Sequence, residues 1–266
     1  MECLLIVFAT IWLLFASIAD IKTKEVPDWL SYSFIGLAAF YRMFDFSLMY
    51  LVTSLAGIVF GYLLYRTGHW GGGDFKLLTA IAIAFPVSPL NKHSFFLVLF
   101  LLFTFLAGGL FAIAYAVYLA IKNKEKFKKN FKNLLIASRF YLIAIIAIIL
   151  FFEILIRESF AILLGILIVF LFFVFMFVFC VEKNFMIIDK PIHELVEGDM
   201  LVSDIYKNRK LICKARKIGL TKEDIQNLKK NGISKVKIKD GIPFVPCFFI
   251  GFIIALILSL LWNGFF

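Results

Sequence analysis

The chain has 266 residues, of which 62% are hydrophobic, with a mean hydropathy of +0.96 and a formal net charge of +10. Soluble domains use roughly 45–50% apolar residues, so this composition excludes an ordinary soluble globular protein. The positive charge alone would suit a nucleic-acid partner. We expect no nucleic-acid partner, because the basic residues follow a membrane-protein pattern instead.

Apolar runs long enough to cross about 30 Å of hydrocarbon recur along the chain. They predict an all-α polytopic membrane protein with about eight transmembrane helices and a small cytosolic α+β unit before the last helix. The first run is not expected to be a cleavable signal peptide, because it has no basic n-region and no small-residue cleavage site. The expected spans cover residues 3–19, 30–43, 47–65, 75–90, 94–121, 140–156, 159–181 and 244–262.

Charge fixes the expected orientation of these spans. If the first residue lies outside, the predicted cytosolic loops hold 25 of the 28 Lys and Arg residues. The positive-inside rule therefore predicts a multi-pass protein of the cell membrane with both termini outside. The basic run 122–132 is expected to act as a topology anchor that touches anionic lipid headgroups, so membrane lipids are expected partners.

The polar segment 182–243 has the pattern of a small cytosolic α+β unit. Residues 200–206 and 234–239 alternate like strands. Residues 220–232 predict a helix with Thr221 as N-cap, Asp224 three residues on and Gly232 just past its end. The remaining parts are a five-helix transmembrane domain (1–121), a basic cytosolic loop with two further helices (122–181) and the last transmembrane helix (244–266).

Cysteine and histidine spacing predicts neither a metal site nor a cofactor. The four cysteines form no C-x-x-C pair, and the three histidines lie far apart in the sequence. We interpret His69 as an interfacial loop residue rather than a catalytic one. The residues concerned are Cys3, Cys180, Cys213, Cys247, His69, His93 and His193.

Two acids lie at the edges of apolar runs. Asp20 ends the first run, and Asp74 follows Gly71, Gly72 and Gly73 directly before another. A carboxylate at such a depth is costly, so each is a candidate functional residue. The predicted topology brings both to the cytosolic face, where two carboxyls sharing one proton can perform aspartic proteolysis. Residues 1–121 are therefore the expected catalytic domain.

Charged neighbours of these acids have simpler interpretations. Asp28 follows Pro27 and is expected to cap a helix. Lys76 could orient a carboxylate, but contact with lipid phosphates is the favoured expectation. Glu25 is expected in a solvated turn. Helix dipoles suggest unequal acids: Asp20 closes the first helix, where a charge is disfavoured, and Asp74 opens another. On this basis Asp20 is the expected acid and Asp74 the expected base.

Two other classes of function remain open. A cation transporter or channel could use the two acids, although such proteins usually hold ionisable groups near the bilayer midplane within inverted repeats. A non-catalytic membrane assembly protein would leave both acidic motifs unexplained.

The segment IADIKTKEVPDWLS, residues 18–31, resembles the first catalytic block of the prepilin peptidases, and WGGGDFKLLTAIA, residues 70–82, resembles their second, G-x-G-D block. The resemblance implies that Asp20 and Asp74 are the catalytic pair, with Gly71, Gly72, Gly73, Lys76, Pro27 and Asp28 as motif support. It also implies a substrate class, pilin-like precursors with a short basic leader before a hydrophobic helix.

The late segment 219–251 is similar to the C-terminal extension of archaeal members, which cleave type IV pilin-like or archaellin precursors. The paired C-x-x-C insertion of many bacterial members is missing, so N-methylation of the product is not predicted. A protease like presenilin or signal peptide peptidase is the nearest alternative, but the chain has no Tyr-Asp or Pro-Ala-Leu motif.

Overall fold

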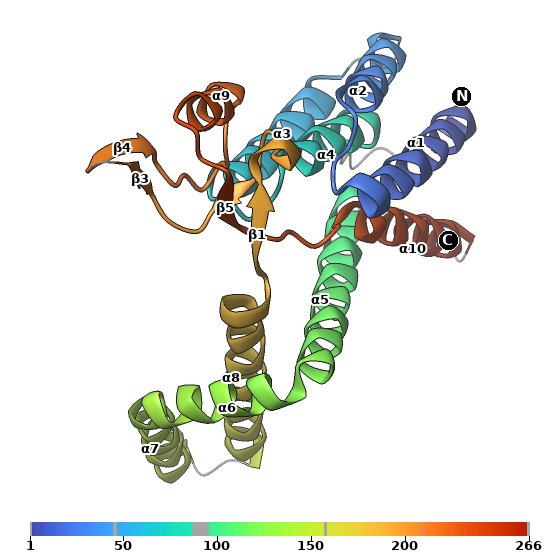
Figure 1. Ribbon diagram of the computed structural model, residues 1–266. Coiled ribbons are helices and arrows are strands. Elements are labelled where there is room, and N and C mark those ends of the chain that lie inside the picture. The colour runs from blue at the N-terminus through green and yellow to red at the C-terminus, as the bar shows by residue number, and fades with distance from the viewer. Residues whose placement is uncertain (1, 45–46, 87–95, 157–158, 208, 265–266) are drawn as a thin grey trace. The chain divides into compact units, whose positions relative to one another are not determined.

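The computed structural model describes residues 2–44, 47–86, 96–156, 159–207 and 209–264. The chain folds as two compact units, Met1–Phe111 with Asp189–Phe266, and Ala112–Ile188. The first unit holds α1 (Glu2–Thr23), α2 (Asp28–Met43), α3 (Leu48–Arg66), α4 (Gly72–Ala84), the start of α5 (Phe96–Lys122), α9 (Lys222–Lys230) and α10 (Val245–Gly264). The second holds the end of α5 with α6 (Lys124–Ala137), α7 (Arg139–Ile156) and α8 (Ser159–Phe185) (Figure 1).

Helix length does not confirm the expected number of spans. Among the described residues, four helices are long and apolar enough to cross a bilayer, within α1, α3, α5 and α8. A fifth crossing results if α6 and α7, which bend by 57°, count as one span. The helices α2 and α4 have 16 and 13 residues, and about 20 are needed to cross. The chain is a multi-pass membrane protein, but eight spans are not confirmed.

Helix α4 lies in the core of the first unit, packed against both α2 and α3. Its side chains Leu77, Leu78 and Ile81 are fully buried. Two glycines of α3 allow the close approach: a Cβ on Gly57 would lie 2.8 Å from the Ala82 side chain. Ridges of α4 therefore fill grooves that α3 leaves open.

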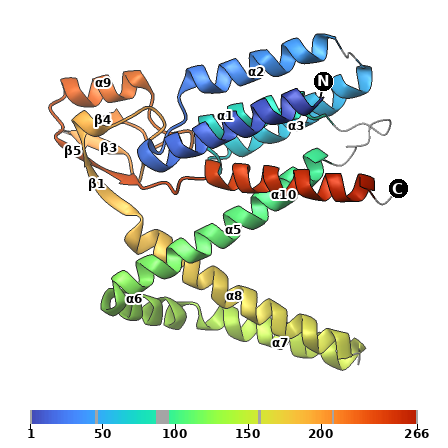
Figure 2. The same ribbon diagram turned by 90° about the vertical axis from the view of Figure 1, so that its right-hand side faces the viewer.

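Helix α10 packs beside α1, as both ribbon views show (Figures 1 and 2). It also crosses α5 closely, because a Cβ on Gly251 would lie 2.7 Å from the Thr104 backbone nitrogen. Aromatic rings close the same region, where Trp70 is buried against Phe244 and Phe248. The end of the chain is thereby fixed against its beginning.

The α+β unit contains a three-stranded sheet in the order β1-β5-β2, made of Ile187–Pro191, Lys235–Lys239 and Met200–Leu201, and a hairpin of β3 (Ile205–Lys207) and β4 (Lys210–Cys213). The predicted helix is confirmed: the Thr221 hydroxyl accepts the Asp224 N–H, the Asp224 carboxylate accepts the Thr221 N–H, and Gly232 has φ +64°. Strand β5 is also confirmed, with Val236 and Ile238 buried.

A single strand over residues 200–206 is wrong. The chain bends between β2 and β3, and the Asp204 carboxylate there accepts the backbone N–H of Ala215 at 2.7 Å. This side-chain bond replaces a continuous ladder and sends β3 into a separate hairpin.

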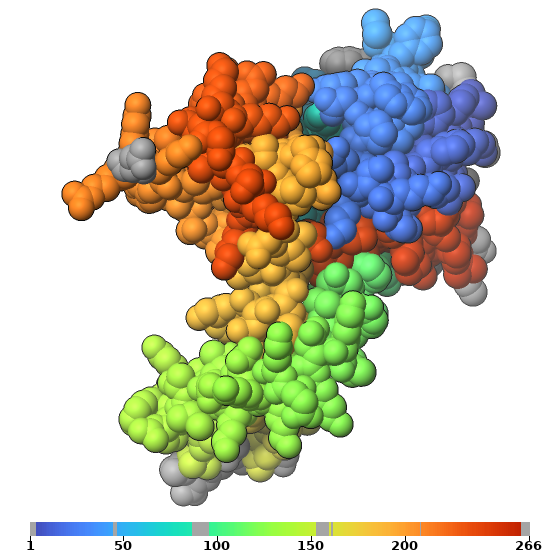
Figure 3. All heavy atoms as spheres, viewed as in Figure 1, coloured from blue at the N-terminus to red at the C-terminus, as the bar shows by residue number. Residues whose placement is uncertain are grey.

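The α+β unit touches the turns that follow α1 and α3. Lys24 forms an ion pair with Asp240, and a Cβ on Gly68 would lie 2.7 Å from the Lys217 carbonyl oxygen. Gly68 also has φ +78°, which favours glycine. In Figure 3 the yellow and orange atoms at the start of this unit lie directly against the blue atoms of the N-terminal helices.

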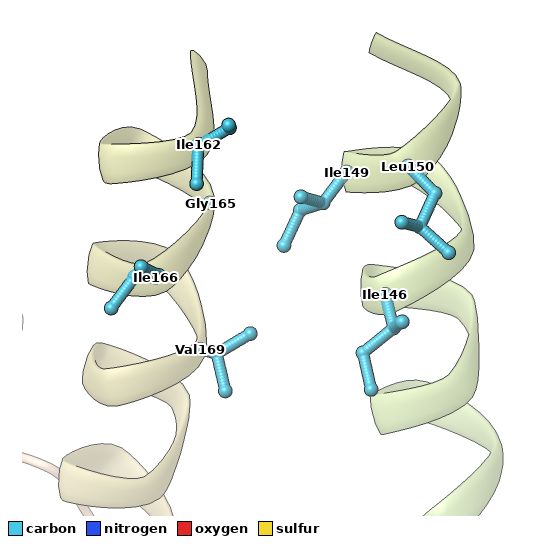
Figure 4. Close-up of a pocket in the computed structure, with 7 residues that line it drawn as sticks. All are labelled: Ile146, Ile149, Leu150, Ile162, Gly165, Ile166 and Val169. Atoms are coloured by element: carbon cyan, nitrogen blue, oxygen red, sulfur yellow. The ribbon is translucent and has the colours of Figure 1, made fainter. Parts of the chain in front are cut away.

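In the second unit the apolar helices α7 and α8 pack side by side, and the basic helix α6 precedes α7 (Figure 2). Phe127 of α6 packs on Phe177 and Phe185 of α8. The described residues that line a hollow of about 260 Å³ between α7 and α8 are aliphatic, together with Gly165 (Figure 4). None of these described lining residues carries a group that could perform chemistry.

Candidate active site

Asp20 lies in the last turns of α1, and its side chain is buried among α1 and the start of α10. The backbone N–H of Val245 donates to Asp20 Oδ2 at 2.9 Å, and the N–H of Phe244 also donates to this carboxyl. One turn earlier the Ser17 hydroxyl contacts the Val245 carbonyl oxygen at 3.3 Å. Asp20 is therefore held by groups 225 residues away in the sequence.

Asp74 is the third residue of α4, and its side chain is partly buried. The N–H of Gly71 donates to Asp74 Oδ2 at 2.9 Å. Burial raises the pKa of this carboxyl to about 7; the Gly71 hydrogen bond opposes the rise, and the charge of Asp20 adds to it. The two acids are thus near enough for one charge to act on the other, as a proton-sharing pair requires.

The glycines before Asp74 have a definite steric role. A Cβ on Gly73 would lie 3.1 Å from the Val26 side chain, so Gly73 lets the turn after α1 pack on the start of α4. That turn begins when the Lys24 N–H bonds to the Asp20 carbonyl oxygen at 2.8 Å, with Lys24 at φ +57°. The segment that carries Asp20 and the segment that carries Asp74 therefore contact each other because of the turn at Lys24 and the missing side chain of Gly73.

The expected capping role of Asp28 is wrong, and Lys76 has a carboxylate partner within the protein. Pro27 is the N-cap residue of α2, and Asp28 makes no capping hydrogen bond. Instead the Asp28 carboxylate pairs with the Lys76 ammonium at 2.5 Å, and this ammonium also lies 4.9 Å from the centre of the Tyr32 ring. Lys76 thus joins α4 to α2.

Asp28→Asn should lower the processing rate by no more than a few-fold and the free energy of unfolding by less than about 1 kcal/mol, because the Asp28 side chain is 71% exposed. Thermal unfolding and precursor cleavage measured on the same membranes check this expectation. Complete loss of cleavage by the stably inserted variant would contradict it.

Two further residues occupy ordinary surroundings. Burial raises the pKa of Glu25, and the nearby charge of Asp199 adds to this rise. His69 Nδ1 lies 2.8 Å from the Thr67 hydroxyl, in agreement with a loop histidine.

Cys247 is buried at the start of α10, near enough to Asp20 and Asp74 for the charges of both to act on its thiol. Helix α10 therefore borders the site together with α1 and α4. No local sequence signal indicated this role of α10.

Asp20 lies between the ends of two helices. The negative C-terminal end of α1 disfavours its charge, as the sequence predicts, but in the structure the positive N-terminal end of α10 also faces Asp20. Two backbone donors at that end oppose the effect of α1.

Comparison with known proteins concerns the first part of the chain. Residues 7–113 match the family model of the type IV leader peptidase family. Prepilin peptidase EppA of Methanothermobacter thermautotrophicus is 34% identical over 103 residues, which cover 35% of this chain and 27% of that protein. No solved structure matches the chain. Residues 7–113 are thus similar to the type IV leader peptidase family, and the match spans about a quarter of the relative's length.

Proposed function

We propose that this chain is a membrane aspartyl endopeptidase that removes the short basic leader from type IV prepilin-like or archaellin-like precursors at the cytosolic face. The observation that carries the proposal is that the charge of Asp20 acts on the Asp74 carboxyl inside the segment that matches the leader peptidases. Two interacting carboxyls take up protons as a unit, so one can stay protonated while the other is ionised.

The chemistry needs both states at once. The ionised carboxyl takes a proton from a water molecule, and the protonated one gives its proton to the oxygen of the scissile carbonyl. A pKa of about 7 for Asp74 supports this division, since it leaves a proton on the pair near neutral pH. The catalytic residues are Asp20 and Asp74. Gly71, Gly73 and Lys76 fix the start of α4.

The charge around the turn after α1 supports a basic leader as the substrate's recognition element. Glu25 lies near Asp199, Asp28 and Glu197, and these three acids pair with Lys190, Lys76 and Lys222. The Glu25 carboxylate is the group of this cluster proposed to attract a positively charged leader.

The cytosolic location rests on the α+β unit. Residues 183–239 contain 14 Lys and Arg residues, and this unit contacts the turns that follow α1 and α3. Basic segments are retained on the cytosolic side of a membrane. The site at the end of α1 would then face the cytosol, where an uncut precursor has its leader.

Co-expression with a precursor that carries a basic leader tests this function. A smaller product on a gel, formed with the wild-type chain and not without it, is expected. An unchanged precursor size, with both proteins present in the membrane, would count against the proposal.

Membrane lipids are the second class of proposed partner, through α6. This helix carries lysines along its length with one acid, Glu125, in its first turn, and none of its residues is buried. Such a basic amphipathic helix suits the anionic headgroup layer.

Replacing Lys126, Lys128, Lys129 and Lys132 by glutamine should abolish the preference of the purified protein for anionic over zwitterionic lipids. Each lysine near a membrane surface contributes on the order of 1 kcal/mol, or about fivefold in affinity. Native mass spectrometry of bound lipids measures the preference. The matched arginine replacements keep the charge and should keep the preference, and a glutamine variant that retains it would exclude α6 as the lipid site.

A further inference from the structure

We infer that the N-terminus of α10 holds Asp20 in its ionised form, so that Asp20 is the base of the pair and Asp74 the acid. This inference rests on the proposed function. It assigns a positioning role to a helix that lies outside residues 7–113, the segment matched by the leader peptidase family.

The backbone at the start of α10 is arranged to bind one carboxylate. The first N–H groups of a helix have no partner within the helix. Pro246 has no N–H, and the N–H of Cys247 bonds to the Phe244 carbonyl oxygen at 2.9 Å. The N–H groups of Phe244 and Val245 both donate to Asp20. Hydrogen bonds to a charged acceptor are stronger than those to a neutral one, so these donors favour the carboxylate.

The helix cannot easily turn away from Asp20. The Ser17 hydroxyl donates to the Leu13 carbonyl oxygen at 2.7 Å and also lies 3.3 Å from the Val245 carbonyl oxygen, so α1 contacts the C=O of Val245 as well as its N–H. On the other side Gly251 lies against the Thr104 backbone, where a Cβ would not fit. Close packing of this kind keeps the two donors in place before a substrate arrives.

Asp74 also lies at a helix N-terminus, that of α4, so a helix dipole favours a negative charge on each of the two acids. Among the described residues, the backbone donor to Asp74 is Gly71, against two donors for Asp20. The charged and titratable groups that face Asp20 are Lys24, Asp74 and the Cys247 thiol. Burial disfavours a charge on both acids, whereas Lys24 favours an ionised Asp20, and the resulting negative charge favours a protonated Asp74.

The proton balance follows from this assignment. Asp20 takes a proton from water as the water oxygen bonds to the scissile carbonyl carbon, and Asp74 gives its proton to the carbonyl oxygen. When the tetrahedral diol collapses, the C–N bond breaks and Asp20 passes its proton to the leaving amine. Asp74 recovers a proton from the diol hydroxyl. The pair ends with one proton on Asp74, as it began.

Val245→Pro tests the role of α10 directly. It removes one donor to Asp20, and proline is well tolerated as the first residue of a helix. The acid limb of the pH profile for precursor cleavage should move up by about one pH unit, because Asp20 becomes easier to protonate. Val245→Ala keeps the N–H and should keep the wild-type pH profile. Lys222→Pro makes the same change at the first residue of α9 and should leave cleavage unchanged.

The two assignments predict different shifts. If Asp20 were the acid, it would bind its proton more tightly after the donor is lost. The alkaline limb of the pH profile would then move instead of the acid limb. That result, or a profile with neither limb shifted, would overturn the inference while leaving the proposed peptidase standing. Loss of cleavage in Asp20→Asn and Asp74→Asn tests the peptidase itself.

If the proline variant does not fold, a measurement on the wild-type sequence still tests the inference. Infrared spectra of the full chain, with a heavy-carbon label in the carboxyl of Asp20 alone or of Asp74 alone, report the charge of each without substrate. At mildly acidic pH we expect the protonated-carboxyl band to shift only with the Asp74 label. A shift with the Asp20 label would refute the assignment, whether or not a precursor is cleaved.

Discussion

Asp20→Asn and Asp74→Asn should each reduce leader removal by roughly a thousandfold or more while the protein stays inserted. Residues that act as one catalytic unit lose nearly the whole effect when either is removed. An amide can neither take a proton from water nor supply one to the carbonyl oxygen as a carboxyl does. The rate of precursor cleavage in membranes with equal amounts of each variant measures the effect.

Asp240→Asn is the matched control, because it neutralises another carboxylate beside the same turn. Asp240 pairs with Lys24 at the surface, and such pairs contribute little to stability. Its cleavage rate should stay close to that of the wild type. Near wild-type cleavage by either Asp20→Asn or Asp74→Asn would show that the two acids are not the catalytic pair.

Gly73→Val should lower the cleavage rate on the order of a hundredfold. The added side chain meets Val26 at the closest point between the turn after α1 and the start of α4, where a Cβ alone would lie 3.1 Å from its neighbour. The turn must then move away and carry Asp20 from Asp74. A displacement of about 1 Å at a catalytic centre can cost a hundredfold in rate.

Gly36→Val separates this steric effect from the general effect of valine in a helix. Gly36 lies within α2, and a Cβ there would meet nothing within 4 Å. We expect its cleavage rate to remain near the wild type. Equal losses in both variants would mean that the contact between Gly73 and Val26 does not fix the distance between the acids.

Local sequence signals predicted those features of the fold that depend on neighbouring residues. The Thr221 and Asp224 capping box formed as expected, since its hydrogen bonds span three residues. The strand over residues 200–206 did not, because the bond from Ala215 to Asp204 comes from eleven residues away. Alternation along a strand carries no information on such a partner.

Partners distant in sequence explain what the motifs could not show. The motifs named Asp20 and Asp74 as candidates, but the donors to Asp20 come from α10, 225 residues later. Likewise Asp28 has the typical place of a helix cap, yet it pairs with Lys76 from the other motif. A side chain with two available uses takes the one that the tertiary fold brings within reach.

Apolar composition predicted a membrane protein, but not the number of crossings. A short apolar helix has the same kind of sequence whether it crosses lipid or is buried by other helices. Helix α4 is an example, with Leu77, Leu78 and Ile81 fully buried by its neighbours.

The most direct test of the central claim is the intact mass of a precursor after incubation with the purified chain in lipid vesicles. The precursor should carry a basic leader followed by a hydrophobic helix. We expect two products that together weigh one water more than the precursor, separated between leader and helix, and none with Asp20→Asn or Asp74→Asn. An uncut precursor, or equal cleavage by an aspartate variant, would contradict the account.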